Sequence, residues 1–379
     1  MSILTEKISP FAIDISDRSL KIIDIEKKKS FLSKKEKISL NFYFNKEIEP
    51  GIIEGGKIIK KDILVKIVKD LLKKLKVRKK FVNLSLPEEK SFLRVIQLPF
   101  IEGIENIKRS AFFEAENYIP LSLEEVYIDA DIIGRSPEGK INVLIAAAPR
   151  KIVNSYTEIL KGAGLLLKGA EIESISLARA LIKRDTNKGA FFIVDFGGTR
   201  TSFIIYSQGS LRFTTTLPLS STSLTKTLSK KLKINFEKAE KLKREFGILP
   251  LKKVILKEKT GDNVLEKKIT EEKALLPFLK DEIDKLAEEI QKYIDYYLSH
   301  IFQYEFIPPN GKKIDRIILC GGGANLKGIS KYLSRKLNIP VVLGNPWVNI
   351  PFFVKNPPLS KEDSLSFATA IGLSERDLI

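Results

Sequence analysis

The chain has 379 residues, enough for two or three domains with separate hydrophobic cores. Hydrophobic residues make up 43% of it and charged residues 30%, a composition typical of an ordered globular protein and not of a disordered one. With one cysteine, Cys320, and one histidine, His300, the chain excludes an internal disulfide and argues against cysteine or histidine metal clusters and Ser-His-Asp catalysis.

The formal net charge of +18 raises the question of nucleic-acid binding. The lysines are scattered from end to end in runs such as KKLKVRKK, however, and 47 acidic residues accompany them. The sequence shows no RNA-binding aromatic pattern and no zinc-ligand spacing. The charge therefore favours a lysine-rich solvated surface, with a nucleic-acid groove and weak attraction to an anionic membrane as alternatives.

The opening MSILTEKISPF lacks the apolar core of a signal peptide. No stretch approaches the ~20 apolar residues that cross a bilayer. We therefore expect a cytosolic protein, unless another component draws it to a membrane.

The first part of the chain predicts a β-meander, a helix and a strand. Apolar residues alternate through residues 11–40, which is typical of three strands joined by short turns. A helix is predicted over residues 60–75, followed by a short strand over residues 81–87. The buried face of this helix is predicted to hold Ile63, Ile67, Leu71 and Leu75.

A smaller unit is predicted over residues 88–164. Its pattern indicates a strand, a helix, two strands around a turn, and a second helix that ends in glycine. These elements are expected at residues 91–99, 104–120, 126–133, 141–149 and 150–164. A further helix is predicted over residues 173–184.

The opening strand–turn–strand returns near the middle of the chain. AIDISDRSLKIIDI (12–25) and IVDFGGTRTSFIIY (193–206) align without a gap, so that Asp14 falls on Asp195. A duplicated unit of this kind predicts two similar half-domains that face each other. The same alignment places Ser16 on Gly197, Arg18 on Thr199 and Leu20 on Thr201.

The second half begins with two predicted helices, residues 220–232 and 236–247. The second of these is expected to be capped by Asn235 and ended by Gly247. Residues 251–268 are expected to form a loop or an edge hairpin.

A long amphipathic helix is predicted over residues 281–298, and His300 is interpreted as a residue of its end. Residues 314–337 follow as a strand that breaks at three glycines and becomes a helix. The apolar face of the long helix is expected to hold Ile283, Leu286, Ile290, Tyr293, Ile294 and Tyr297.

Three loops carry the residues that suggest chemistry. The two repeated turns each present one aspartate, followed by small or hydroxyl residues whose backbone N–H groups can form an anion-binding nest. A carboxylate beside such a nest would repel a bare phosphate, but a divalent cation between them relieves the repulsion, as in magnesium–nucleotide sites. The third loop, CGGGANLKG at residues 320–328, allows a flat group to lie against its backbone, although it lacks the P-loop and dinucleotide-binding spacings.

Together, the two aspartate turns and the late glycine-rich loop resemble the actin-like nucleotide-binding superfamily, which includes actin, sugar kinases and Hsp70 ATPase domains. Within it the chain is similar to the PilM family of type IV pilus assembly proteins and to the related cell-division protein FtsA. FtsA usually ends in a membrane-targeting amphipathic helix, and the lack of this pattern here favours PilM. The similarity is carried, in order, by EAENYIPLSLEEVYIDADII, AAAPRKIVNSYTEILKGAGL, IESISLARAL, FEKAEKLKREFG, CGGGANLKGISKYLSRKLNIPVVLGNPW and DSLSFATAIGLSERD.

This resemblance implies an α/β fold, namely a duplicated, ribonuclease H-like actin ATPase fold with an inserted small α/β subdomain. Residues 1–87 and 165–186 would form the first half (IA), with residues 363–379 packing back on it, and residues 88–164 the inserted subdomain (IC). Residues 187–226 and 314–362 would form the second half (IIA), and residues 227–313 a mainly helical subdomain (IIB).

The resemblance also implies a site for ATP and Mg²⁺. Asp14 would hold the metal through water, and Asp195 would contact the metal or the attacking water. Lys21 has the spacing of a phosphate-contacting lysine, and Glu173 falls where relatives carry a water-polarising acid, although a carboxylate at a helix start is equally natural. The other implied ligands are Ser16, Arg18, Ser19, Gly197, Gly198, Thr199 and Thr201 around the phosphates, Glu240 and Lys243 at the ribose or base, and Gly321, Gly322, Gly323 and Asn325 under the adenosine.

Two features of these residues leave alternatives open. Glu240 and Lys243 would look the same on an ordinary polar helix face. The first turn reads DISDRS, whereas the family pattern is Asp-Ile-Gly followed by small residues, so Asp17 and Arg18 bring charges close to the phosphates. This departure leaves nucleotide affinity, and hydrolysis above all, open.

By resemblance, the chain is expected to be an ATP-binding scaffold, at most a slow ATPase, at the cytoplasmic face of the inner membrane. It would grip the cytoplasmic N-terminal peptide of PilN in a groove between the first half and the inserted subdomain, with RSAFFEAENYIP in one wall. PilO and the pilus motor ATPases are further expected partners, and no specific nucleic acid is expected. The alternatives are an FtsA-like filament-forming ATPase, a small-molecule kinase, for which the inserted unit has the wrong size and pattern, and a basic nucleic-acid binder.

Overall fold

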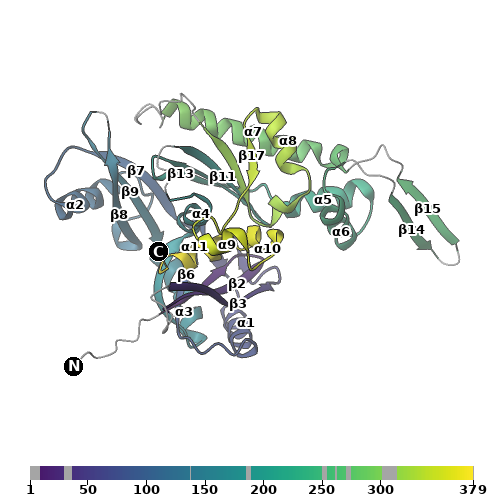
Figure 1. Cartoon of the computed structure of the whole chain (residues 1–379), viewed down its shortest axis with the longest axis horizontal. Helices are drawn as coiled ribbons and strands as arrows, with labels where there is room; N and C mark the ends of the chain where they lie inside the picture. Colours follow the sequence, from purple (N-terminus) through teal and green to yellow (C-terminus); the bar gives the residue numbers. More distant parts are fainter. Residues whose placement is uncertain are drawn as a thin grey trace.

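The computed structural model describes residues 9–29, 36–136, 138–184, 189–249, 254–260, 263–269, 275–300 and 314–378. Two five-stranded sheets form the centres of two halves of the molecule, and a three-stranded sheet lies beside them (Figure 1). β14 (Val254–Thr260) pairs antiparallel with β15 (Asn263–Ile269). The predicted hairpin is thus present, but among the described strands it forms a sheet of its own and not the edge of a larger one.

The first sheet contains the predicted meander. β1 pairs antiparallel with β2, which pairs antiparallel with β3, while β6 and β10 continue the sheet in parallel on the other side of β1. In order across the sheet, the strands are β10 (Leu166–Ile172), β6 (Phe81–Leu86), β1 (Phe11–Ile15), β2 (Ser19–Lys29) and β3 (Glu36–Glu47). A short hairpin of β4 (Ile53–Glu54) and β5 (Lys57–Ile58) precedes the first helix.

Helices cover both faces of this sheet because its strands are apolar on both sides. Phe11, Ile13 and Ile15 pack against α1 (Lys61–Lys74) and α3 (Arg150–Gly162). Ala12, between them, faces the opposite side, where it packs with the end of the chain. That end consists of α9 (Pro351–Lys355), α10 (Lys361–Ser366) and α11 (Ala368–Glu375).

The buried face of α1 differs from the predicted one. Leu64, Val68 and Leu71 are buried, whereas Ile63 is 45% exposed. The prediction was right for Leu71 and wrong for Ile63, because two adjacent faces of this helix both have apolar residues at helical spacing.

The inserted unit has its own small core. An antiparallel sheet in the order β7 (Phe92–Leu98), β9 (Ile141–Pro149) and β8 (Val126–Arg135) packs against α2 (Ile104–Ala115). Two short 3-10 helices, η1 (Glu88–Lys90) and η2 (Leu123–Glu125), flank it. The helix α3 that follows instead buries Tyr156 and Ile159 in the core of the first sheet. We therefore propose that the inserted subdomain ends near Pro149 and that α3 belongs to the first half.

The second sheet has the same strand arrangement as the first. The ladder pairs Ile13 with Ile22 in the first hairpin and Val194 with Phe203 in the second, which are equivalent pairs in the ungapped alignment. The strands in order across the sheet are β13 (Ser210–Leu217), β12 (Thr201–Ser207), β11 (Ala190–Phe196), β16 (Arg316–Cys320) and β17 (Val341–Leu343).

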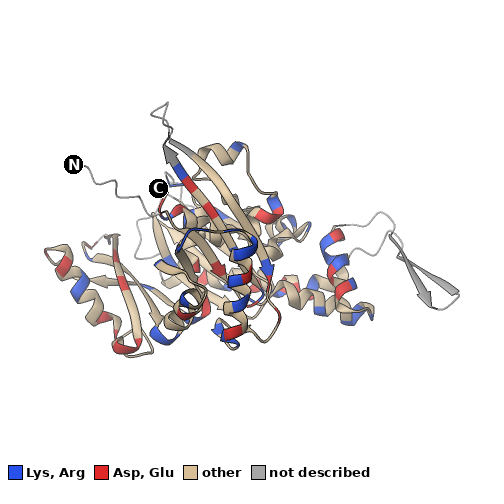
Figure 2. Ribbon diagram, turned by 90° about the horizontal axis from the view of Figure 1, so that it is seen from below, with Lys and Arg blue, Asp and Glu red and all other residues tan. Residues whose placement is uncertain are grey.

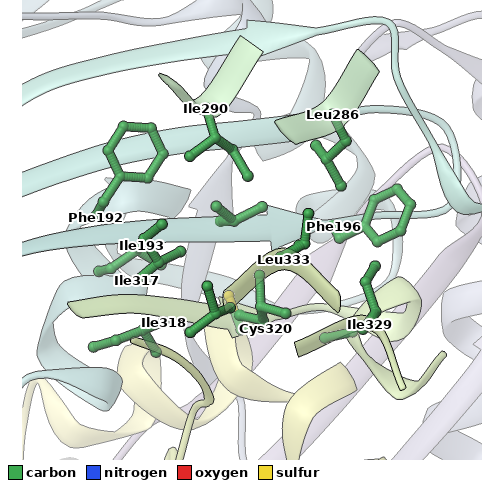
Figure 3. Close-up of a cluster of buried hydrophobic side chains, with 14 of the residues drawn as sticks. Phe192, Ile193, Phe196, Leu286, Ile290, Ile317, Ile318, Cys320, Ile329 and Leu333 are labelled. Carbon is green, nitrogen blue, oxygen red and sulfur yellow. The ribbon is translucent and has the colours of Figure 1, made fainter. Parts of the chain in front are cut away.

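The helices α7 (Leu276–His300) and α8 (Ile329–Leu337) pack on the second sheet. As predicted, His300 lies at the end of α7, and this helix buries Ile283, Leu286, Ile290, Ile294 and Tyr297. The side chains that meet in this core, shown in Figure 3, include Phe192, Ile193, Phe196, Leu286, Ile290, Ile317, Ile318, Cys320, Ile329 and Leu333.

Beside the second sheet lie α5 (Ser221–Leu232) and α6 (Phe236–Phe246). The predicted ends of α6 are confirmed, since the Asn235 side chain accepts a hydrogen bond from Lys238 N and Gly247 follows the last residue. Figure 2 shows basic and acidic residues interspersed along the described ribbon, which fits a solvated lysine-rich surface. None of the described helices is both long enough and apolar enough to cross a membrane.

Glu375, at the end of α11, is a buried carboxyl group. It is 0% exposed, and neither of its oxygens has a hydrogen-bond partner among the described residues. Desolvation raises its pKa from 4.5 to about 8, although Arg179 and Arg184 act against this rise. Between these two values the folded protein holds a proton that the unfolded chain has released, so stability falls as the pH rises from about 4.5 to about 8.

Replacing Glu375 with glutamine is expected to remove this part of the pH dependence. As the pH rises from 5 to 9, the free energy of unfolding of the variant should increase relative to that of the wild type. The increase should be on the order of a few kcal/mol, because each unit of pKa shift corresponds to about 1.4 kcal/mol. Urea unfolding at several pH values measures the difference. Glu362→Gln, at an exposed carboxylate of α10, is the control, and equal pH slopes for Glu375→Gln and the wild type would contradict the prediction.

Candidate functional site

The first hairpin turn (residues 16–18) and the second hairpin turn (residues 197–200) face each other. Thr199 Oγ1 donates a hydrogen bond to Asp17 Oδ2 at 3.3 Å, and a Cβ at Gly198 would lie 3.9 Å from Arg18 Cγ. The repeat therefore brings the two predicted phosphate turns together, as the sequence predicted for two half-domains that face each other.

Asp14 is held in place at the end of β1. Ser85 Oγ donates a hydrogen bond to its Oδ1 at 2.7 Å, and Lys21 Nζ lies 3.4 Å from its Oδ2. Lys21 reaches it because the β1–β2 ladder sets the two residues opposite each other. Asp14 is buried, and each of its carboxylate oxygens has a partner in the protein.

Asp195 lies between the second hairpin turn and the glycine-rich loop (residues 320–328). In the parallel ladder between β11 and β16, Asp195 lies beside Cys320. If residue 321 carried a side chain, its Cβ would lie 2.3 Å from Asp195 Oδ1 and 2.8 Å from Phe196 O. The loop thus approaches the carboxylate closely because residue 321 has no side chain, and its φ of +79° also favours glycine. Desolvation raises the pKa of Asp195; the charge of Lys21 acts against this rise, and the charge of Asp14 adds to it.

Arg200, which the sequence analysis did not single out, is the cation at the centre of the site. Its Nε lies 2.7 Å from Glu89 Oε2, its Nη1 3.4 Å from Asp17 Oδ2 and its Nη2 3.5 Å from Glu173 Oε1. These carboxylates raise its pKa above the usual value despite desolvation. One guanidinium group therefore joins the second hairpin turn to the first turn, to η1 and to the start of α4 (Glu173–Leu181).

Asp17 has a different role from the one that the sequence suggested. Gly55 N and Gly56 N donate hydrogen bonds to its carboxylate at 3.1 and 3.0 Å, and Arg200 pairs with it. Its charge is compensated by these donors, so it fixes the first hairpin turn to the loop before α1. The negative charge that Asp17 was expected to bring close to the phosphates is therefore offset within the protein.

Glu173 begins α4 close to both predicted metal ligands. Desolvation raises its pKa well above the ordinary value; Arg200 acts against this rise, and Asp14 and Asp195 add to it. Its Oε2 also accepts a hydrogen bond from the backbone N–H of Glu88, with an N···O distance of 3.5 Å. Its carboxyl group is therefore engaged with donors of the protein.

Several other predicted ligands have protein partners in this structure. Thr201 Oγ1 donates to Leu219 O, Ser16 Oγ contacts Ser19 Oγ, and Asn325 Nδ2 donates to Glu362 O. Gly322 and Gly323 lie in η4 (Gly322–Asn325) of the glycine-rich loop, with Gly323 packed closely on Phe196.

Glu240 and Lys243 join α6 to α5. Lys243 Nζ donates to Ser221 O and Thr225 Oγ1 at 2.8 and 2.7 Å and pairs with Glu240 Oε2 at 2.8 Å. Desolvation acts to raise the pKa of Glu240, but hydrogen bonds from Lys243, Thr225 and Arg244 outweigh it and lower the pKa to about 2. Both side chains hold the helices together, and their contact with a nucleotide stays a prediction.

The residues between the turns suit a magnesium–nucleotide better than a protein-bound metal. Within the described ranges, no group of three or more His, Cys, Asp or Glu side chains could hold a metal ion. Asp14 and Asp195 supply two carboxylates, and Mg²⁺ commonly uses one or two, together with waters and substrate phosphates. The donor set therefore fits Mg²⁺ that is bound with a nucleotide.

A separate groove of about 860 Å³ lies between two sheet edges. One wall is β7, an edge strand of the inserted subdomain, with Tyr118 and Ile119 from the end of the predicted wall. The other wall is β13, an edge strand of the second sheet, so this groove borders the second half and not, as the sequence had predicted, the first half. Glu88 and Glu89 of η1 line it as well. Edge strands have unpaired backbone groups, so the groove can accept an extended peptide.

Curated relatives of the chain are cell-division proteins. FtsA of Neisseria meningitidis serogroup B is 22% identical over 292 residues, covering 74% of this chain and 66% of that protein. FtsA of Pseudomonas aeruginosa is 22% identical over 266 residues, covering 68% of this chain and 58% of that protein. The chain therefore spans less than two thirds of the length of these relatives.

Solved structures establish the fold. The PilM-PilN type IV pilus biogenesis complex matches with a TM-score of 0.75 at 21% identity, covering 98% of this chain and 99% of that chain. MreB5 of Spiroplasma citri bound to ADP matches with a TM-score of 0.53 at 15% identity, covering 92% and 97%. The predicted actin-like α/β fold is confirmed. A family model described as type IV pilus assembly protein PilM matches residues 12–378, so this chain belongs to the PilM family.

Proposed function

We propose that this protein is an ATP-binding scaffold of the type IV pilus inner-membrane assembly platform. The proposal that the protein binds a nucleotide rests on one observation, namely that the two hairpin turns face each other. This arrangement brings Asp14 and Lys21 of one half close to Asp195 and the glycines of the other half. Asp14 and Asp195 would hold Mg²⁺, and Lys21 and the backbone amides of the second hairpin turn would hold phosphates. A bound Mg²⁺ would neutralise phosphate charge. The ADP-bound MreB5 of similar fold supports this proposal.

We further propose that hydrolysis is slow at most. Glu173 is the predicted water-polarising acid, yet its carboxylate pairs with Arg200 and accepts a hydrogen bond from the amide of Glu88, so it is less available to orient a water.

The groove between β7 and β13 is the proposed site for the cytoplasmic N-terminal peptide of PilN. The likeness to the PilM-PilN complex supports this partner. An extended peptide would pair with one of the open strand edges and place alternate side chains against Val95 and Phe213. Attachment to PilN would hold the protein at the cytoplasmic face of the inner membrane, near PilO and the motor ATPases.

Calorimetric titration with a synthetic peptide of the PilN cytoplasmic N-terminus tests the groove. Val95→Glu places a charge in the β7 wall and is expected to weaken peptide binding at least about tenfold, equivalent to 1.4 kcal/mol. Ile132→Glu, on β8 of the same sheet and outside the groove lining, is the matched control and should bind as the wild type does. Equal affinities for the Val95→Glu variant and the wild type would place the peptide elsewhere.

An FtsA-like filament-forming role is the second candidate, favoured by the FtsA relatives. Sedimentation with Mg-ATP separates the two functions. Filaments that pellet with Mg-ATP and do not need the peptide would favour the second candidate.

A further inference from the structure

Three carboxylates lie at one edge of the first sheet. Asp17 is in the turn after β1, Glu89 is in η1 after β6, and Glu173 directly follows β10. These three strands are neighbours and run parallel, so their carboxyl ends meet at the same edge of the sheet. The fold of the first half therefore gathers three acidic side chains in one place.

Arg200 reaches this edge from the second half of the molecule. Its guanidinium group contacts all three carboxylates, and the four side chains are at most 14% exposed. The backbone of Arg200 also closes the second hairpin turn, because Gly197 N donates a hydrogen bond to Arg200 O at 2.9 Å. One residue thus shapes the turn that carries the predicted phosphate-binding amides and joins this turn to the other half.

The three carboxylates depend on Arg200 to different extents. Within the described ranges, Arg200 is the only cation at ion-pair distance from Glu89 or Glu173. Glu89 makes the shortest contact, at 2.7 Å, whereas Asp17 lies 3.4 Å from Nη1, which makes no hydrogen bond there. A buried carboxylate that loses its cation keeps the cost of desolvation without the compensating charge. A small opening between the halves is therefore unfavourable, since it separates the charges before water can hydrate them.

We propose that this ionic cluster, Asp17, Glu89, Glu173 and Arg200, holds the two hairpin turns against each other before a nucleotide binds. Arg200 is thus a positioning residue, and its effect on ATP binding rests on the proposed function. It keeps the amides of the second hairpin turn opposite the first turn, so the nucleotide meets a site that is already assembled. The cluster also accounts for the acidic residue by which the first turn departs from the family pattern.

The first test measures the distance between the halves in the full chain without nucleotide. Spin labels are attached at Asp70→Cys in α1 and Glu237→Cys in α6, both exposed positions, whereas the native Cys320 is buried. The labelled protein should show one distance, and Arg200→Gln should add a second, longer one. Arg200→Lys keeps the charge without the planar fork and should restore part of the single distance.

Arg335→Gln, at an exposed arginine of α8, is the matched control and should leave the single distance unchanged. The proposal is overturned if Arg200→Gln shows the same single distance as the protein without this substitution, or if that protein already shows two distances. Glu89→Gln leaves Arg200 in place and removes only the shortest contact, so it provides the same test if Arg200→Gln does not fold.

A second test separates positioning from simple charge. Glu89→Gln removes a negative charge near the predicted phosphates, which by Coulomb attraction alone would strengthen Mg-ATP binding. If the cluster positions the turn, the same change weakens Mg-ATP binding at least about threefold, within the usual coupling between residues in contact. Equal or tighter binding would overturn the positioning role. A wild type that does not bind Mg-ATP would overturn the proposed nucleotide site, whereas the distance between the halves would still decide whether the cluster holds the turns together.

Discussion

Replacing Asp195 with asparagine is expected to weaken Mg-ATP binding roughly 100-fold, equivalent to about 2.7 kcal/mol. The change removes one of the two carboxylates that are proposed to hold Mg²⁺ and leaves the side-chain shape nearly the same. Shape matters here because the glycine-rich loop packs closely on this side chain, with Gly321 directly against Oδ1. A loss of affinity is then due to the charge and not to collapse of the loop. Calorimetric titration with Mg-ATP measures it.

Asp131→Asn is the matched control, since Asp131 is an exposed carboxylate on β8. It should bind Mg-ATP and unfold in urea as the wild type does. Asp195→Asn should be at least as stable as the wild type, because it removes a carboxylate whose pKa is raised by desolvation. If Asp195→Asn binds Mg-ATP with full affinity, the nucleotide does not lie between the two turns.

The paired hairpins could be predicted because the information is local. Their apolar residues alternate, and the repeat has no gap, so the sequence alone indicates two strand–turn–strand units and which of their positions are equivalent. Lys21 then reaches Asp14 as a consequence of the β1–β2 register. The roles of these residues toward a nucleotide remain predictions.

Arg200 could not be assigned in the same way, because its partners are far away in the sequence. Asp17, Glu89 and Glu173 reach it only through the packing of η1 and α4 on the two turns. The sequence held one signal, an arginine inside a turn of glycines and hydroxyl residues. The error at Ile63 has a similar origin, since only the position of the sheet decides which of two apolar helix faces is buried.

Replacing Gly372 with alanine is expected to destabilise the protein by about 3 kcal/mol, at the upper end of the usual cost of adding a methyl group to a packed core. Gly372 lies in α11 where this helix crosses α4 backbone to backbone. A Cβ at this position would lie 1.9 Å from Ser176 O and 3.1 Å from Ala180 Cβ. The helices would have to separate, and Arg179 Nη1 would lose its hydrogen bond to Gly372 O, now 2.8 Å long.

Urea unfolding of Gly372→Ala and of a second glycine variant measures this cost. Gly322→Ala is the matched control, because its Cβ would meet only Ser366 Oγ, at 3.8 Å, and its backbone needs no left-handed conformation. Its stability should stay close to that of the wild type. Because α4 begins at Glu173, separation of the helices would also move the carboxylate that pairs with Arg200, so Gly372→Ala should bind Mg-ATP more weakly even where it remains folded. A Gly372→Ala variant as stable as the wild type would show that the two helices do not touch through their backbones.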